Sequence, residues 1–212
     1  MKEILCFGDS NTWGLNPATY CLNSKKYGRF SRDVRWTGRL AEALQPYDYH
    51  VVEEGLCGRT TVFEDELRDN RRGSDMLPTL LESHAPDKVI LMLGTNDCKS
   101  YYHASAEVIG LGIEKLIEQI RTYSESIEIL LVSPILLGEH VWEAEYDPEF
   151  DQQSVQTSKQ LKKVYQKIAL QNGIEFLAAS DYARASEIDQ EHMEEEEHRK
   201  LADGIFEKMT SN

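Results

Sequence analysis

The chain has 212 residues, of which 41% are hydrophobic and 28% are charged, and its formal net charge at pH 7 is -14. This length and composition are typical of one globular domain with a sizeable core, and no Pro-, Gly- or Ser-rich linker divides residues 1–212. The negative charge disfavours nucleic acid and anionic lipid surfaces as partners, since no basic stripe is present beyond residues 68–72. We expect no membrane-spanning helix, because no run of apolar residues is long enough to cross a bilayer.

The cysteines indicate the redox environment. Cys6, Cys21, Cys57 and Cys98 lie far apart and form no CxxC pair, which indicates neither a zinc knuckle nor a thioredoxin-like site. The first predicted strand begins close to Met1, so we expect no cleaved leader peptide. These features favour a cytoplasmic protein with reduced thiols.

Short apolar segments alternate with amphipathic segments along the chain, as strands and helices do in an α/β protein. In chain order they predict a strand over 4–7, a helix over 32–45, a strand over 50–53, a helix over 73–84, a strand over 88–93, a helix over 105–124, a strand over 128–132, a helix over 154–171, a strand over 174–178 and a helix over 194–209. We therefore predict a single three-layer α/β/α domain. Its five-stranded parallel sheet has right-handed crossovers and the flavodoxin-like strand order 2-1-3-4-5.

Residues 135–153 follow neither pattern and are expected to form a long excursion. This segment carries Trp142, Tyr146 and Phe150 among acidic residues. Three roles remain open for it, namely a lid, a rim of the substrate site and a subunit interface.

The first strand leads into the turn Gly8-Asp9-Ser10-Asn11. In the predicted topology this turn lies at the carboxyl edge of the sheet, where open α/β sheets bind ligands. A serine in this place can act as a nucleophile, and nearby helix N-terminal amides can stabilise an oxyanion. The same residues also suit an ordinary strand-to-helix turn, so Ser10 alone does not predict catalysis.

Two further turns follow neighbouring strands. Asn96 lies in Gly94-Thr95-Asn96-Asp97, which the strand order places opposite Ser10, and its amide can donate to an oxyanion. Asp97 is expected to cap or brace this turn. Gly58 follows the second strand and, having no side chain, lets its N–H approach an oxyanion closely. Each residue also suits a plain cap or turn.

A nucleophilic serine needs a base, and the base needs an acceptor that holds its tautomer. Asp189 and His192 lie three residues apart before the last helix and can supply both. His198 is the main competitor, but it falls within that helix, where a solvated face or local packing is expected. The spacing of His192 and His198 is not HExxH, which disfavours zinc. The absence of GxGxxG and GxxxxGK[ST] disfavours nucleotide cofactors.

Together, the turns around Ser10, Gly58 and Asn96 and the Asp189-x-x-His192 segment resemble the GDSL-type SGNH hydrolases over nearly the whole chain. Residues 6–14, 35–38, 54–61 and 91–97 further resemble the small bacterial arylesterase and acyltransferase branch of that family.

The resemblance implies roles for these residues. Ser10 is the nucleophile, His192 the base and then the acid, and Asp189 the residue that orients His192. The Ser10 N–H, the Gly58 N–H and the Asn96 amide form the oxyanion hole.

The chain departs from the family pattern in three places. Asn11 stands where the family commonly has leucine, which leaves the nucleophile intact. Gln190 and Met193 stand where relatives often have glycine and leucine. Gln190 alters the loop that holds His192 if its position requires a positive φ.

The resemblance implies a serine-dependent carboxylic ester hydrolase that cleaves short-chain acyl esters, acetyl esters above all, through an acyl-serine intermediate. No metal or organic cofactor is expected, and the partner is a small acyl ester. Trp13 and Trp36 are candidate walls of a small apolar acyl pocket, and equally candidate core aromatics. Since relatives on this branch tend to self-associate, a homo-oligomer is expected.

Two alternatives remain. In an acyltransferase or perhydrolase, an alcohol or a peroxide would intercept the same acyl-enzyme in place of water. A non-catalytic module would bind a small ligand on the flavodoxin-like sheet, because a fold does not determine a function.

Overall fold

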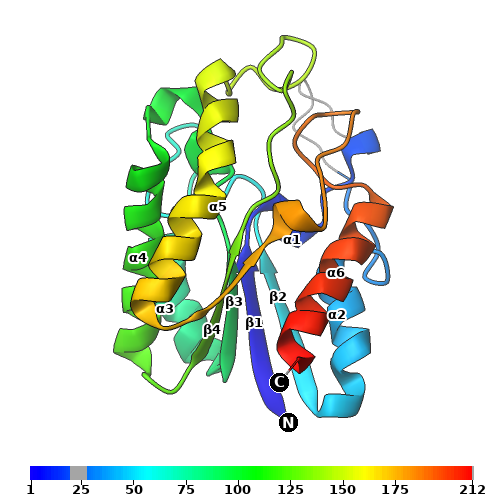
Figure 1. Ribbon diagram of the computed structural model, residues 1–212, viewed down its shortest axis with the longest axis vertical. Helices are drawn as coiled ribbons and strands as arrows, with labels where there is room; N and C mark the ends of the chain where they lie inside the picture. The colour runs from blue at the N-terminus through cyan, green and yellow to red at the C-terminus, as the bar shows by residue number, and fades with distance from the viewer. Residues whose placement is uncertain (20–27, 212) are drawn as a thin grey trace.

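The computed structural model describes residues 1–19 and 28–211 (Figure 1), so the predicted free thiol of Cys21 lies outside the described residues. One sheet of five parallel strands has the order β2-β1-β3-β4-β5. Its strands are Lys2–Gly8 (β1), Tyr49–Gly55 (β2), Lys88–Met92 (β3), Glu128–Ser133 (β4) and Glu175–Ala178 (β5). The predicted α/β class, the parallel sheet and its strand order are confirmed.

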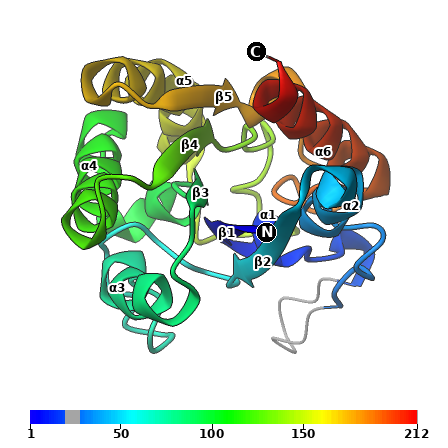
Figure 2. The same cartoon turned by 90° about the horizontal axis from the view of Figure 1, so that it is seen from below.

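Helices cover both faces of this sheet (Figure 2). They are Ser10–Trp13 (α1), Trp36–Leu44 (α2), Gly73–His84 (α3), Ala106–Tyr123 (α4), Gln152–Asn172 (α5) and Glu195–Thr210 (α6). Short 3-10 turns occupy Pro17–Thr19, Gln45–Tyr47, Asn96–Cys98, Ser100–Tyr102 and Ala179–Asp181. Helices α2 and α6 lie on one face, and α3, α4 and α5 lie on the other. In the described part of the chain, no helix has both the length and the apolar character needed to span a bilayer.

Strand β1 shows why the sheet needs both layers. Its apolar side chains alternate, so Leu5 and Phe7 pack in the core under α3, α4 and α5, whereas Ile4 and Cys6 pack under α2 and α6. All four side chains are fully buried. Burying a side chain of this size contributes roughly 1.5–3 kcal/mol, so the two cores together hold β1 at the centre of the sheet.

The strand register brings the site's segments together. Gly8 at the end of β1 pairs with Gly55 at the end of β2 and with Met92 at the end of β3. The segments that follow these three strands therefore leave the sheet side by side at its carboxyl edge. Because the chain turns to opposite sides after β1 and β3, this edge is where a crevice can form.

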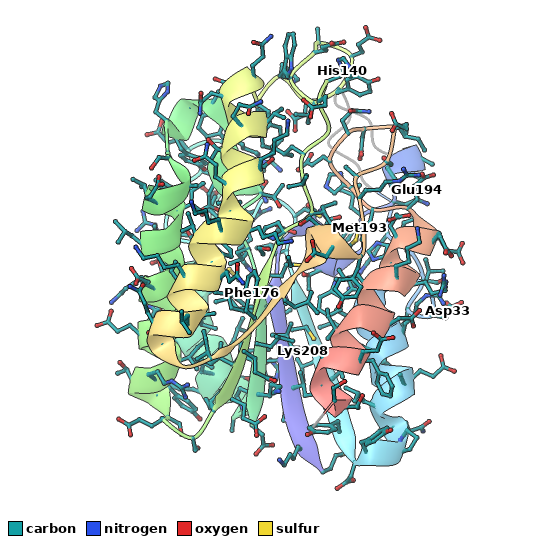
Figure 3. The ribbon with its side chains drawn as sticks, in the orientation of Figure 1. Asp33, His140, Phe176, Met193, Glu194 and Lys208 are labelled. Carbon is teal, nitrogen blue, oxygen red and sulfur yellow. The ribbon has the colours of Figure 1, made fainter. Side chains whose placement is uncertain are left out.

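The excursion between β4 and α5 packs over this edge. Phe150 is buried in the core beneath α4 and α5, and Trp142 packs against the same core. The N–H of Gly138 donates to the carbonyl oxygen of Gln190 at 2.7 Å, which joins the excursion to the segment before α6. Figure 3 shows His140 on the excursion, at the end of the molecule opposite the N-terminus. The excursion thus forms part of the rim above the carboxyl edge.

Candidate active site

Ser10 is placed by a tight turn between β1 and the single-turn helix α1. Asp9 caps this helix, and its Oδ1 accepts a hydrogen bond from the N–H of Asn11 at 3.0 Å. Gly8 is needed at the end of β1, since a Cβ there would lie 2.1 Å from Thr12 Oγ1 and 2.8 Å from the carbonyl oxygen of Met92. This close packing leaves Ser10 as the first residue of α1, buried at the carboxyl edge of the sheet.

The structure brings three of the predicted residues into one hydrogen-bonded chain. Ser10 Oγ lies 2.8 Å from His192 Nε2, and His192 Nδ1 lies 2.7 Å from Asp189 Oδ2. All three side chains are buried. These contacts are those of a hydroxyl nucleophile, its base and the acceptor that orients the base.

Asp189 also holds the loop in which it lies. Its Oδ1 accepts from the N–H of His192 at 2.9 Å, from the N–H of Glu191 at 3.1 Å and from the hydroxyl of Ser186 at 2.8 Å. Burial alone would raise the pKa of Asp189. The positive charge of His192 and the hydrogen bonds from His192 and Glu191 outweigh burial, so the pKa of Asp189 lies below its usual value. Asp189 is therefore an anion when His192 receives a proton.

His192 is a strong base in this setting. Burial lowers its pKa, but the negative charges of Glu191 and Asp189 outweigh burial and raise the pKa to about 9. His198 has the opposite environment. It is fully buried, its Nδ1 accepts from the N–H of Trp36 at 3.4 Å, and burial lowers its pKa to about 3. His198 therefore packs locally as a neutral residue, one of the two roles expected for it.

Gln190 has a positive φ of 61°, the backbone conformation in which glycine is favoured. The loop keeps its shape because the N–H of Gln190 donates to the carbonyl oxygen of Ser186 at 3.0 Å, while the excursion binds the carbonyl of Gln190. A left-handed conformation costs a non-glycine residue roughly 1–2 kcal/mol. His192 thus stays next to Ser10 although the loop carries this strain.

Gly58 and Asn96 lie in the same pocket as Ser10. Gly58 has a φ of 82°, and a Cβ there would lie 3.0 Å from the guanidinium of Arg68. One hydrogen of the Asn96 amide is donated to the carbonyl oxygen of Arg59 at 3.1 Å, and the other remains for a ligand. In residues 1–19 and 28–211, the backbone N–H groups of Ser10 and Gly58 have no hydrogen-bond acceptor. These donors are therefore available to an oxyanion.

The loop that carries Gly58 is held by two buried charges. The guanidinium of Arg59 donates to the carbonyl oxygen of Gly8 at 2.9 Å and lies 4.2 Å from the centre of the Phe7 ring. Asp97 accepts from the N–H of Thr61 at 2.9 Å, and burial raises its pKa to about 6. Asp97 was expected to cap or brace its own turn, but its side chain instead holds the neighbouring loop through Thr61. No sequence pattern indicated the role of Arg59.

Asn11 connects the turn that carries Ser10 to the loop that carries His192. Its Nδ2 donates to the carbonyl oxygen of Glu191 at 3.3 Å, and its Oδ1 accepts from the N–H of Met193 at 3.0 Å. Met193 lies next to Glu194, just before the start of α6 (Figure 3). Asn11 therefore binds the backbone on both sides of His192. The sequence marked Asn11 as a departure but did not predict this role.

The pocket at Ser10 is small, with about 20 Å³ of free space. Its apolar lining consists of Leu15 and Cys57, and its charged lining residues are Arg68, Lys99, Asp147 and Glu191. The expected apolar pocket is therefore replaced by a polar one.

Neither predicted tryptophan wall lines this pocket in the described part of the chain. Trp36 is fully buried in the core under α2 and α6, where its Nε1 donates to the carbonyl oxygen of Asn11 at 3.1 Å. Trp13 is half-buried beneath the guanidinium of Arg29, which lies 5.1 Å from its ring centre. The two rings pack against protein groups, which explains why they do not form the pocket.

Known proteins share this arrangement of elements. A model of the GDSL-like lipase/acylhydrolase family matches residues 6–199, a span that includes both Ser10 and His192. The structure of a carbohydrate acetylesterase family member from Sinorhizobium meliloti is 36% identical over 97% of this chain and 96% of that chain, with a TM-score of 0.87. The native aryl esterase of M. smegmatis is 34% identical over 100% of this chain and 99% of that chain, with a TM-score of 0.87. No curated protein matches the chain.

Proposed function

Because the chain belongs to the GDSL-like lipase/acylhydrolase family, we propose that it is a serine-dependent hydrolase of short-chain carboxylic esters, acetyl esters above all. The observation that carries this proposal is the hydrogen-bonded chain from Ser10 through His192 to Asp189. The small pocket at Ser10 supports a short acyl group, and the names of the two structural neighbours describe an acetylesterase and an aryl esterase.

The proposed reaction has two halves. His192 Nε2 takes the proton of Ser10 as the Oγ attacks the ester carbonyl, and the N–H groups of Ser10 and Gly58 and the Asn96 amide stabilise the oxyanion. His192 then gives its proton to the departing alcohol, which leaves an acyl-serine. Water attacks this ester in the same way, and the acid is released. Asp189 remains ionised and holds His192 in position throughout.

Labelling by a fluorophosphonate tests this proposal. Ser10 of the unmodified protein should react covalently with the reagent and should turn over an acetate ester. Ser10→Ala should lose both labelling and turnover, because it removes the hydroxyl that lies 2.8 Å from His192 Nε2. Ser126, exposed before β4 at the opposite edge of the sheet, offers a matched control, and Ser126→Ala should retain both.

Two results would contradict the proposal. Full turnover by Ser10→Ala would exclude Ser10 as the nucleophile. A protein that binds esters without labelling or turnover would be the non-catalytic module. Analysis of the products with added alcohol or peroxide shows whether water or another acceptor takes the acyl group.

We also propose that the protein is a cytoplasmic homo-oligomer. Cys6, Cys57 and Cys98 are free thiols, as expected in a reducing compartment. Large apolar side chains, among them Leu67 and Leu111, are exposed and can be covered in an oligomer. Light scattering that detects only a monomer would contradict the second part of this proposal.

A further inference from the structure

Glu191 is a buried carboxylate directly beside the proposed acid. It precedes His192 in the chain, lines the pocket at Ser10 and is 5% exposed. Its Oε1 lies 3.8 Å from His192 Nε2, the nitrogen that gives its proton to the departing alcohol. The carboxylate of Glu191 therefore lies on the side of the site where the alcohol leaves.

The side chain of Glu191 has no structural task in the described part of the chain. Its N–H and its carbonyl oxygen bind Asp189 and Asn11, but these are backbone groups. Within residues 1–19 and 28–211, its carboxylate has no hydrogen-bond donor, and its only ion-pair partner is His192. Because Glu191 lines the pocket at Ser10, a hydroxyl group of a bound ligand can supply the missing donor. Burial also raises the pKa of this carboxyl to about 7, which fits an acceptor that lacks donors.

The other charges in the pocket indicate the kind of ligand. Arg68 donates to Glu149 at 3.1 Å, and Lys99 forms an ion pair with the same carboxylate. Asp147 and Glu191 are acids on the same lining. Because the pocket lining carries both positive and negative charges, it does not select a cationic or an anionic alcohol. A neutral hydroxyl group both donates and accepts, so it can satisfy these groups.

We propose that Glu191 is a specificity-determining residue that accepts a hydrogen bond from a second hydroxyl group of the leaving alcohol. The preferred substrates are then short acyl esters of polyols, in which a free hydroxyl lies next to the ester oxygen. Only two carbon atoms separate the oxygens of a 1,2-diol, so an ester oxygen at His192 Nε2 brings the neighbouring hydroxyl to Glu191. This inference rests on the proposed function, since His192 Nε2 marks the leaving group only if His192 is the acid.

Two acetate esters of nearly equal size test the inference. 2-Hydroxyethyl acetate and propyl acetate differ only in a terminal hydroxyl in place of a methyl group. The measured quantity is the ratio of their kcat/KM values, divided by the ratio of their rates of alkaline hydrolysis. Both esters use the same base, so any effect of Glu191 on the pKa of His192 cancels from this ratio.

The unmodified protein should prefer the hydroxy ester, and Glu191→Leu should reduce the preference about tenfold, or about 1.4 kcal/mol. Glu191→Gln should keep part of the preference, because its amide oxygen still accepts a hydrogen bond. Glu194 is exposed on the same segment and does not line the pocket, so Glu194→Leu is the matched control and should keep the full preference.

The outcomes separate the two proposals. An absence of turnover and of Ser10 labelling in the unmodified protein contradicts the proposed function. Turnover of both esters without a preference, or with a preference that Glu191→Leu retains, contradicts the inference and leaves the function intact. If Glu191→Leu does not fold, the inference is tested with the unmodified protein and Glu191→Gln. It requires that the unmodified protein prefers the hydroxy ester and that Glu191→Gln shows a smaller preference.

Discussion

The charge of Glu191 should control the pH at which the protein becomes active. His192 accepts the Ser10 proton only when its Nε2 is unprotonated, so kcat/KM should rise as the pH rises through the pKa of His192. That pKa is about 9, because the charges of Glu191 and Asp189 outweigh the opposing effect of burial. The pKa of Glu191, which burial raises, is about 7, so this carboxylate is charged while His192 titrates. Glu191→Gln removes the charge and should shift the acid limb of the profile to lower pH.

The distance between the two side chains sets the size of this shift. At the 3.8 Å between Glu191 Oε1 and His192 Nε2, Coulomb's law gives about 1 kcal/mol in water and about 4 kcal/mol at an effective dielectric constant of 20. These energies correspond to roughly one to three pKa units. Asp9 and Asp189 also raise the pKa of His192, and both remain in the variant. The midpoint of the acid limb should therefore move towards the pKa of a free histidine and stay above it.

The assay is the initial rate of hydrolysis of propyl acetate in a pH-stat, below saturation, across neutral and alkaline pH. Under this condition the profile reports the ionisation of the free enzyme. Propyl acetate has no hydroxyl for Glu191 to bind, so the shift is separate from the proposed specificity. Glu194→Gln should leave the limb in place. An acid limb that stays fixed or moves to higher pH in Glu191→Gln would refute the reasoning.

Three further substitutions test the groups that position His192. Asp189→Asn should reduce kcat by roughly 10⁴-fold, since His192 then loses its anionic acceptor; a loss below tenfold in kinetic assays would show that another group orients it. Asn11→Leu should lower kcat roughly tenfold to a hundredfold with little change in KM, because two hydrogen bonds of about 1 kcal/mol each are lost. Asn11→Asp should keep part of the rate, because its carboxylate still accepts a hydrogen bond from the N–H of Met193. Equal kinetics for the unmodified protein and both variants would contradict this prediction. Gln190→Gly should unfold at a higher temperature than Gln190→Ala, by about 1 kcal/mol in stability, because only alanine retains the strain at a φ of 61°; the reverse order in thermal melts would contradict it.

Hydrophobic patterning predicted most of the fold because the strands are buried on both faces. Leu5 and Phe7 occupy one core and Ile4 and Cys6 the other, so the whole run is apolar and its boundaries are clear. The start of α2 was predicted too early, over residues 32–45. The reason is a tertiary contact, since the extended Arg35 binds Glu53 of β2 through hydrogen bonds of 2.9 and 3.0 Å, and the helix begins only at Trp36.

In the candidate site, too, local sequence motifs were predictable and contacts between distant segments were not. The sequence predicts Ser10 and His192 as site residues because each lies in a short motif with a recognisable spacing, and the structure places their side chains in contact. The sequence does not predict the contacts of the Asn11 side chain, which binds residues about 180 positions away, since such contacts exist only after the chain has folded.

The pocket lining was the least predictable part, because separate segments of the chain supply it. Cys57 follows β2, Lys99 follows β3, and Asp147 belongs to the excursion after β4. No spacing connects these residues, so a motif that indicates how an ester is cleaved leaves open which ester fits. A place next to His192 does not decide the matter either, since Glu191 lines the pocket whereas Met193, on the other side of His192, packs in the core. Only the folded chain therefore shows which neighbours of His192 face the pocket.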